Sequence, residues 1–399
     1  MQLPAFFLPV LYRSIFITTL FMMCSNVLRA QRDSSLHTQD STRKHPEAVW
    51  LALSGETAHI LSDGTPEGER LLDSSRYSAI NLRVGWQVPS PDVYAQLYRH
   101  PMYGLGFYYS RYRNENFGHP LGLYGWFDIP FTRHTTGRWR FSYYGAFGLS
   151  FNFNPFDEKT NPNNKYIGSK RNVYVSLMAN ATYFITPRLA VIGGVGFRHF
   201  SNSARVLPNY GINMIPVQLA LAYKINKVQI DKRLDTIPRF KPRWLTNVWI
   251  AGGHKEYEIG GDAFLKMTFT AEELYQFSYK FRAGIGFNAF YASGAQKRDS
   301  SNASGFSKAM SYGITANGEW VLRPNLYVPL AIGYYLKHHE LNDETQSTYV
   351  RVGVRAKVWK NWFAGITVKA HGGTSDVFEW TAGHTFGKDR NNYKRLMIF

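Results

Sequence analysis

Two residues that could perform nucleophilic chemistry stand close together in one apolar stretch. Residues 189–201 read L-A-V-I-G-G-V-G-F-R-H-F-S and include His199 and Ser201. Successive side chains of a β-strand point to opposite faces, so His199 and Ser201 share the apolar face, whereas Arg198 lies on the other. Polar groups in an apolar setting are costly unless they have partners. The spacing therefore predicts a serine hydroxyl beside an imidazole that could accept its proton.

A second apolar stretch supplies a third polar group. Residues 211–225 read G-I-N-M-I-P-V-Q-L-A-L-A-Y-K-I, and Asn213 lies on their apolar face. If residues 203–209 form a hairpin loop, the simplest register places Asn213 opposite His199. With Ser201, these residues would supply a nucleophile, a base and a group that orients the base, all facing lipid.

These residues resemble one known family, the outer-membrane lipid A 3-O-deacylases, which are PagL-like acyl hydrolases. The resemblance covers residues 193–213 and rests on His199-Phe200-Ser201-Asn202, followed at fixed offset by Pro208-Asn209, Gly211-Ile212 and the position of Asn213. It implies an outer-membrane serine esterase that removes an ester-linked acyl chain from lipid A of lipopolysaccharide, without a cofactor or a metal. By position, Ser201 would be the nucleophile, His199 the general base, and Asn202 an oxyanion-hole or substrate-binding residue.

The chain departs from this family pattern at Asn213, where the family carries a glutamate. An amide oxygen can hold the histidine tautomer, but it adds no negative charge to stabilise the imidazolium that forms when serine attacks. In a serine triad, replacing the acid by its amide costs roughly four orders of magnitude in turnover. Glu256 or Glu258 could supply a carboxylate instead. The rival interpretation is a catalytically inactive outer-membrane barrel that serves as a structural protein, a channel or a lipid-binding module.

The start of the chain has the layout of a secretory signal peptide. Arg13 precedes an apolar run, residues 14–24, that is too short for a transmembrane helix. The signal would span residues 1–30 and end at a cleavage site with a small residue. A buried N-terminal helix and lipid attachment at Cys24 are the alternatives. Residues 31–46 are polar and predict a disordered lead-in. Removal of the signal would take the single cysteine with it.

Composition indicates a membrane barrel. The 399 residues are 16% aromatic and include 34 glycines, and their mean hydropathy is only -0.30. A helical membrane protein would be far more apolar, whereas a barrel hides its lipid-facing residues in alternation. The net charge of +18 points to anionic lipopolysaccharide and other outer-membrane lipids as partners. We expect no nucleic-acid partner, because the chain is predicted to be exported and lacks a basic helix or finger.

Alternation of large apolar residues with small or charged residues recurs along the chain. It is clearest in residues 81–88, 103–110, 139–153, 279–288, 312–320 and 350–358. The pattern predicts an all-β transmembrane antiparallel barrel of about 14 to 16 strands, with short periplasmic turns, longer extracellular loops and a water-filled lumen. A short helix is expected within residues 91–99.

We place residues 47–399 in one outer-membrane barrel, located in the cell outer membrane. The long linker 226–243 also permits two smaller barrels, and residues 393–399 resemble a barrel C-terminal signature. The alternation of short and long connections makes residues 189–201 run outward, which places His199 and Ser201 near the outer leaflet. The sequence leaves open whether the barrel forms a homodimer.

Overall fold

The computed structural model describes residues 47–62, 64–73, 75–87, 93–132, 137–228, 237–298, 306–372 and 374–387. The predicted signal peptide, the polar lead-in and the C-terminal signature lie outside the described residues. Within the described part, no helix has both the length and the apolar character needed to cross a membrane.

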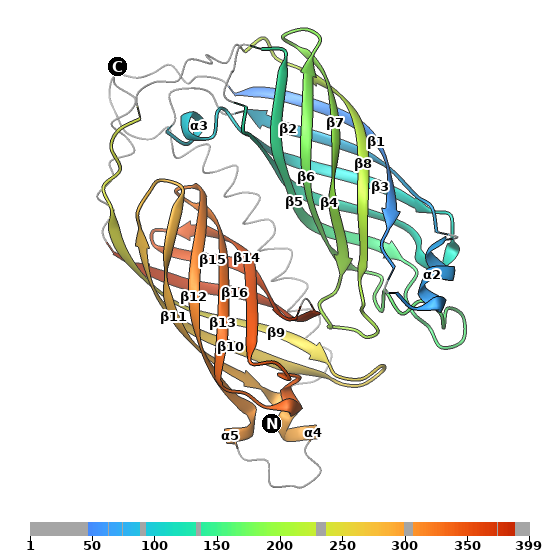
Figure 1. Cartoon of the computed structure of the whole chain (residues 1–399), viewed down its shortest axis with the longest axis vertical. Coiled ribbons are helices and arrows are strands. Elements are labelled where there is room, and N and C mark those ends of the chain that lie inside the picture. The colour runs from blue at the N-terminus through green and yellow to red at the C-terminus, as the bar shows by residue number, and fades with distance from the viewer. Residues whose placement is uncertain are drawn as a thin grey trace. The chain divides into compact units, whose positions relative to one another are not determined.

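The described residues form sixteen antiparallel strands in two closed sheets (Figure 1). The first sheet contains β1 (Ala48–Ile60), β2 (Tyr77–Gln87), β3 (Met102–Tyr112), β4 (Gly118–Pro130), β5 (Trp139–Phe153), β6 (Asn172–Phe184), β7 (Leu189–Ser201) and β8 (Ile212–Lys224). The second contains β9 (Arg243–Glu256), β10 (Ala263–Gln276), β11 (Phe281–Ala292), β12 (Met310–Arg323), β13 (Leu326–Lys337), β14 (Thr348–Trp359), β15 (Trp362–His371) and β16 (Thr374–Phe386).

Short helices occupy some of the connections between strands. They are α2 (Pro66–Asp73), α3 (Val93–Leu97), α4 (Ser293–Arg298), α5 (Phe306–Ala309) and the 3-10 turns η1 (Glu115–Phe117) and η2 (Glu340–Asn342). Helix α3 confirms the helix expected within residues 91–99.

The number of strands predicted from the sequence was correct, but the prediction that they close into a single barrel was wrong. We expected one barrel over residues 47–399. Instead β8 pairs with β1, and β16 pairs with β9, so that each group of eight strands closes on itself. Residues 225–242 connect the two barrels, which is the arrangement that the long linker left as the alternative.

Side chains fill the lumen of the N-terminal barrel, which corrects the expected water-filled interior. Arg198 reaches from β7 to form a buried ion pair with Glu56 of β1. The ring of Tyr174 stacks on those of Tyr108 and Tyr124, with centroids 5.0 Å apart in both pairs. An eight-stranded barrel is just wide enough for its inward side chains to meet across it, so charged inward residues find partners instead of bulk water.

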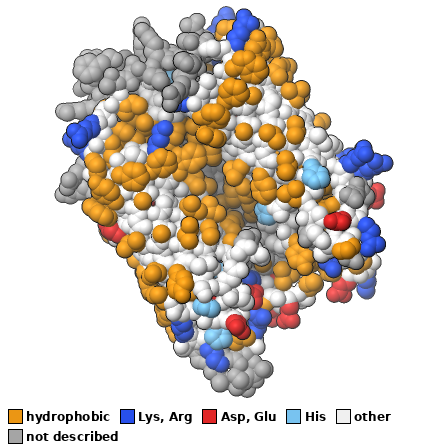
Figure 2. All heavy atoms as spheres, in the orientation of Figure 1, with side chains coloured by type: hydrophobic (Ala, Val, Ile, Leu, Met, Phe, Trp, Pro, Cys, Tyr) orange, Lys and Arg blue, Asp and Glu red, His pale blue; other side chains and the backbone are white. Residues whose placement is uncertain are grey.

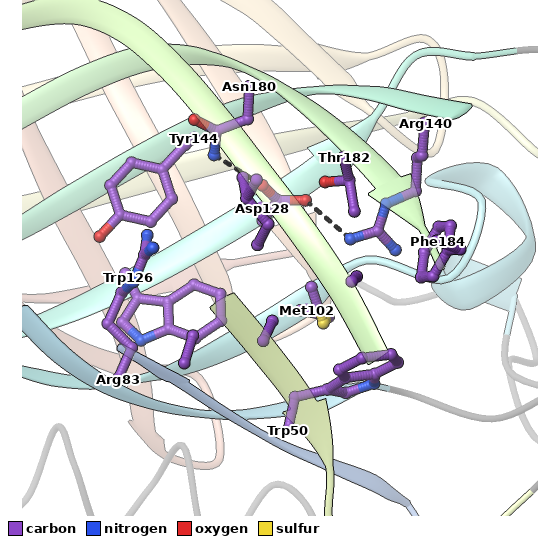
Figure 3. A pocket seen from close by; sticks show the side chains of 14 residues that line it. Trp50, Arg83, Met102, Trp126, Asp128, Arg140, Tyr144, Asn180, Thr182 and Phe184 are labelled. Carbon is purple, nitrogen blue, oxygen red and sulfur yellow. Dashed lines mark hydrogen bonds and ion pairs between the residues drawn. The ribbon is translucent and has the colours of Figure 1, made fainter. Parts of the chain in front are cut away.

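The cavity that remains in this lumen is small (Figure 3). Asp128 lies beside it, where it accepts a hydrogen bond from Asn180 at 3.1 Å and pairs with Arg140 at 3.4 Å. The cavity has a volume of about 30 Å³, which is room for about two waters. A pocket for a drug-sized ligand is roughly ten times larger, so this cavity is too small for a lipid.

Ion pairs likewise fill the lumen of the C-terminal barrel. The buried pairs are Arg282 with Glu319 at 2.7 Å, Arg355 with Glu272 at 2.7 Å, Arg351 with Glu379, and Lys255 and Lys266 with Asp376 at 2.7 and 2.8 Å. A cavity among Trp249, Arg351 and Arg355 has a volume of about 20 Å³. In both barrels, the charged side chains that point inward therefore pair with one another across a narrow lumen.

The outward faces of both barrels are apolar, as the alternation predicted. Exposed large hydrophobic residues occur on successive strands and include Leu53, Leu82, Leu123, Leu219, Ile285 and Ile332. Figure 2 shows hydrophobic side chains over much of the visible barrel walls. Polar interiors and apolar walls are the arrangement of transmembrane β-barrels.

Candidate active site

The β7–β8 hairpin positions the predicted site residues. Its observed register pairs His199 with Asn213 and Arg198 with Met214, which confirms the register expected from the sequence. Because Arg198 points into the lumen, where its ion pair is buried, its neighbour His199 must point outward. The side chain of His199 is half-buried, and Ser201 is only 5% exposed.

The three outward side chains form a continuous hydrogen-bonded chain. His199 Nε2 lies 2.7 Å from Ser201 Oγ, and His199 Nδ1 lies 2.7 Å from Asn213 Oδ1. An amide oxygen can only accept a hydrogen bond, so the ring proton must be on Nδ1. Nε2 is then free to accept the serine proton. The geometry is that of a nucleophile, its base and an orienting group.

The absence of a side chain at Gly211 leaves space for the His199 ring. Its φ angle of +75° is rarely adopted by other residues, and a Cβ atom built on it would lie 2.7 Å from His199 Cε1 and 3.3 Å from Ser201 Cβ. Any larger residue would therefore strain the backbone and displace the imidazole. The sequence motif contained this glycine, but only the structure shows that it packs against the site.

Asn202, the predicted oxyanion-hole or substrate-binding residue, lies in the loop that follows Ser201. Its backbone N–H donates to Asn209 Oδ1 at 2.9 Å. Its side chain donates from Nδ2 to the Val206 carbonyl at 3.0 Å and accepts the Val206 N–H at 3.1 Å. These bonds make Asn202 an organiser of the loop. The second hydrogen of Nδ2 is the donor that it could offer to an oxyanion, and that role stays a prediction.

The loop between β5 and β6 supports the site, which sequence reasoning missed. The N–H of Gly211 donates to the Tyr166 carbonyl at 2.9 Å. A Cβ on Gly168 would lie 2.6 Å from the Pro208 carbonyl oxygen, so the two loops are in close contact. Asn164 donates to two backbone carbonyls, at 2.8 and 2.9 Å, and fixes the fold of this loop. The asparagine-rich run at 161–164 was the available signal, because asparagine commonly bonds to nearby backbone.

Asn213, and neither Glu256 nor Glu258, is the hydrogen-bond partner of His199 Nδ1. Glu256 ends strand β9 of the second barrel, and Glu258 follows it in the next connection. Among the described residues, no cluster of three or more histidine, cysteine or carboxylate side chains is arranged to hold a metal ion.

The C-terminal barrel has no corresponding site on its seventh strand. Strand β15 ends at His371 and β16 begins at Thr374, so the long connection that carries Asn202 in the first barrel is replaced by a tight one. His371 is buried and bonds to Tyr335 at 2.8 Å, and its outward neighbour is Ala370. The hydrogen-bonded serine and histidine thus lie on β7 of the N-terminal barrel, and β15 contains no serine to match them.

The fold defines a class, that of antiparallel β-barrels with apolar outer walls, and the first of the two barrels carries the hydrogen-bonded Ser201–His199–Asn213 chain on its outer wall. A comparison with family models gives a more specific similarity. Residues 244–389 match the model described as acyloxyacyl hydrolase, C-terminal domain. Residues 244–389 are thus similar to a domain of the PagL-like acyl hydrolases, which supports the same family as the motif does but does not include residues 193–213. The match falls on the second barrel, a part of the chain in which the sequence showed us no motif.

Other comparisons add only general likeness. No curated protein matches the chain. Among solved structures, neisserial surface protein A (NspA) has 10% identity and a TM-score of 0.30, with 44% of this chain and 97% of that chain covered. The siderophore receptor PirA from Pseudomonas aeruginosa has 11% identity and a TM-score of 0.20, with 87% and 81% covered. Omp33 from Acinetobacter baumannii has 9% identity and a TM-score of 0.15, with 86% and 99% covered. Scores this low carry no argument about function.

Proposed function

We propose that this protein is an outer-membrane serine esterase that removes an ester-linked acyl chain from lipid A of lipopolysaccharide. The observation that carries the proposal is the hydrogen-bonded chain Ser201–His199–Asn213 on the lipid-facing wall of the N-terminal barrel. The acyl hydrolase family of residues 244–389 supports the reaction class. The choice of lipid A rests on the family resemblance of the motif.

The reaction proceeds in two stages at Ser201. His199 Nε2 takes the hydroxyl proton as Oγ attacks the ester carbonyl, and Asn213 Oδ1 holds the imidazole through the Nδ1 hydrogen. The tetrahedral intermediate collapses, the ester C–O bond breaks, and His199 returns the proton to the departing alcohol of the lipid. Water, deprotonated by His199, then releases the fatty acid from Ser201. No step in this sequence requires an added cofactor.

The location of the site favours a membrane lipid as substrate. Ser201 is the last residue of β7, and the next residues belong to a longer connection of the kind that lies outside the membrane. Below it on the same face, Phe197 and Val195 are 40% and 50% exposed. An acyl chain of an outer-leaflet lipid can therefore lie along this wall while its ester reaches the serine, and the membrane supplies proximity.

The packed lumens speak against the channel form of the inactive-barrel interpretation. Ion pairs and aromatic rings occupy the described lumen of each barrel, and the cavities found there have volumes of only about 30 and 20 Å³. A structural or lipid-binding role without turnover is the remaining rival. Asn213 in the place of an acid is the feature that favours it.

Mass spectrometry of lipid A separates the two functions. Cells that produce the wild-type protein should contain lipid A that lacks one ester-linked acyl chain, and cells that produce Ser201→Ala at equal level should not. A second variant, Ser150→Ala, removes a buried hydroxyl inside the same barrel and serves as a matched control for folding. Identical acylation in the wild-type and Ser201→Ala cells would refute the proposed function.

A further inference from the structure

Three basic side chains border the nucleophile on the loops of the N-terminal barrel. Lys165 and Arg171 belong to the connection between β5 and β6, and Arg205 belongs to the connection between β7 and β8. All three are exposed. Among the described residues, none of the three side chains forms a hydrogen bond or a salt bridge. The charge of Arg205 attracts the nearby Glu256 carboxylate, whereas those of Lys165 and Arg171 are available to a ligand.

Backbone contacts hold Arg171 near Ser201. Strand β6 pairs Val173 with Ser201, and Arg171 precedes that pair by two residues. The Ser169 hydroxyl donates to the Arg171 carbonyl at 2.9 Å and accepts its N–H at 3.2 Å, which fixes the turn.

Lys165 approaches from the other side of the hairpin loop. Its carbonyl accepts the N–H of Tyr210 at 3.3 Å, and the next pair of residues, Tyr166 and Gly211, is joined in the same way at 2.9 Å. Gly211 packs against His199. Arg205 lies in the intervening loop, where its N–H bonds to the Asn202 carbonyl at 3.3 Å. The backbones of the three basic residues therefore lie in the two loops that meet beside the serine.

Basic residues outnumber the carboxylates in this region. Residues 154–171 and 202–211 contain five lysines and arginines, against Asp157 and Glu158. A third carboxylate, that of Glu256, contacts the second loop, where it accepts the Leu207 N–H at 2.9 Å. The β7–β8 connection, residues 202–211, contains no acidic residue. In the β5–β6 connection, Asp157 Oδ1 accepts the N–H groups of Lys159 and Thr160 at 3.0 and 2.8 Å, so this carboxylate is engaged in its own turn. The rim beside the nucleophile thus has a local excess of positive charge, positioned beyond the strand ends, where lipid headgroups lie.

We propose that Lys165, Arg171 and Arg205 form a binding site for the phosphate of an anionic lipid headgroup. Guanidinium and ammonium groups are the usual donors for phosphate oxygens. The placement orients the lipid so that its headgroup lies over the loops and its ester lies at Ser201. The inference deepens the proposed function and rests on it only for the chemistry at Ser201, because phosphate binding can be measured without turnover.

The binding experiment uses the full-length protein in detergent micelles with Ser201→Ala as the background, so that no substrate is consumed. The probes are two diacylated glucosamine lipids that differ by one phosphate. The test variant adds Lys165→Gln, Arg171→Gln and Arg205→Gln. The control adds Arg111→Gln, Arg113→Gln and Lys159→Gln, which removes the same charge; two of its sites lie at the end of β3, four strands from β7 in the barrel order.

The background protein should bind the phosphorylated lipid about ten-fold more tightly than the other lipid at low salt, since exposed ion pairs each contribute a few-fold at most. The test variant should lose this preference and the control should keep it. The preference should shrink in 0.5 M salt because mobile ions screen exposed charges. Equal binding of the two lipids by the background protein, or equal loss in test and control variants, would overturn the headgroup site.

Two further arms separate the alternatives. Inorganic phosphate should compete only weakly; if it displaces the lipid at comparable concentration, the site recognises free anions and the headgroup proposal is wrong. Hydrolysis is measured separately with Ser201 restored. Hydrolysis without phosphate preference refutes the headgroup site alone, whereas phosphate preference without hydrolysis refutes the proposed function alone.

Discussion

Replacement of Asn213 by aspartate tests the site most directly. The two side chains have the same shape, so Asn213→Asp places a carboxylate oxygen where Oδ1 now lies, 2.7 Å from His199 Nδ1. In the wild-type protein the amide orients the imidazole but leaves the imidazolium of the transition state without a counter-charge. The variant supplies that charge, and we therefore expect faster ester hydrolysis.

The magnitude follows from the distance. With the charge centres about 4 Å apart and an effective dielectric constant of about 20, the attraction is about 4 kcal/mol, equivalent to about three orders of magnitude in rate. The carboxylate would be half-buried and would lose part of its hydration, which offsets some of this gain. We expect an increase in kcat of about 100-fold, below the roughly 10,000-fold loss that the reverse change causes in a serine triad.

The assay is fatty-acid release from an ester-linked lipid A substrate in micelles, with kcat and KM determined separately. KM should change little, since the charge acts in the transition state. Asn213→Ala is the matched control, because it removes the orienting oxygen and should lower kcat. Asn213→Glu restores the residue type of the family but adds a methylene, and we expect it to gain less than aspartate. If folded Asn213→Asp is no faster than wild type, Asn213 does not act through His199 and the triad is wrong.

Three other measurements follow from the structure. Gly211→Ala should lower kcat at least 100-fold while the barrel stays folded, because the new methyl group would displace the His199 ring; near wild-type turnover would show that the ring has more room than we infer. Glu56→Ala should reduce the free energy of unfolding by about 3–5 kcal/mol, because Arg198 would be left buried without its counter-charge; urea titration measures this, and a change below about 1 kcal/mol would mean that water compensates the arginine. The protein in planar bilayers should show no stepwise ion current, because paired charges fill the lumens; stable conductance steps would contradict the closed interiors.

The sequence by itself determined the local features of this protein. Alternation fixes which side chains of a strand share a face, so the outward placement of His199 and the inward placement of Arg198 could be predicted. A hairpin brings nearby residues together, so the register that joins His199 to Asn213 also followed from the sequence. The family resemblance at residues 193–213 came from the same short segment.

Only the tertiary structure decided how the strands close and what surrounds the site. Pairing of β1 with β8, and of β9 with β16, joins strands far apart in the chain, and alternation is the same for one barrel of sixteen strands as for two of eight. The narrow lumens that result convert charged inward faces into ion pairs. The support that the β5–β6 loop gives to the hairpin loop also depends on contacts between irregular segments, which have no periodic pattern in the sequence to predict them.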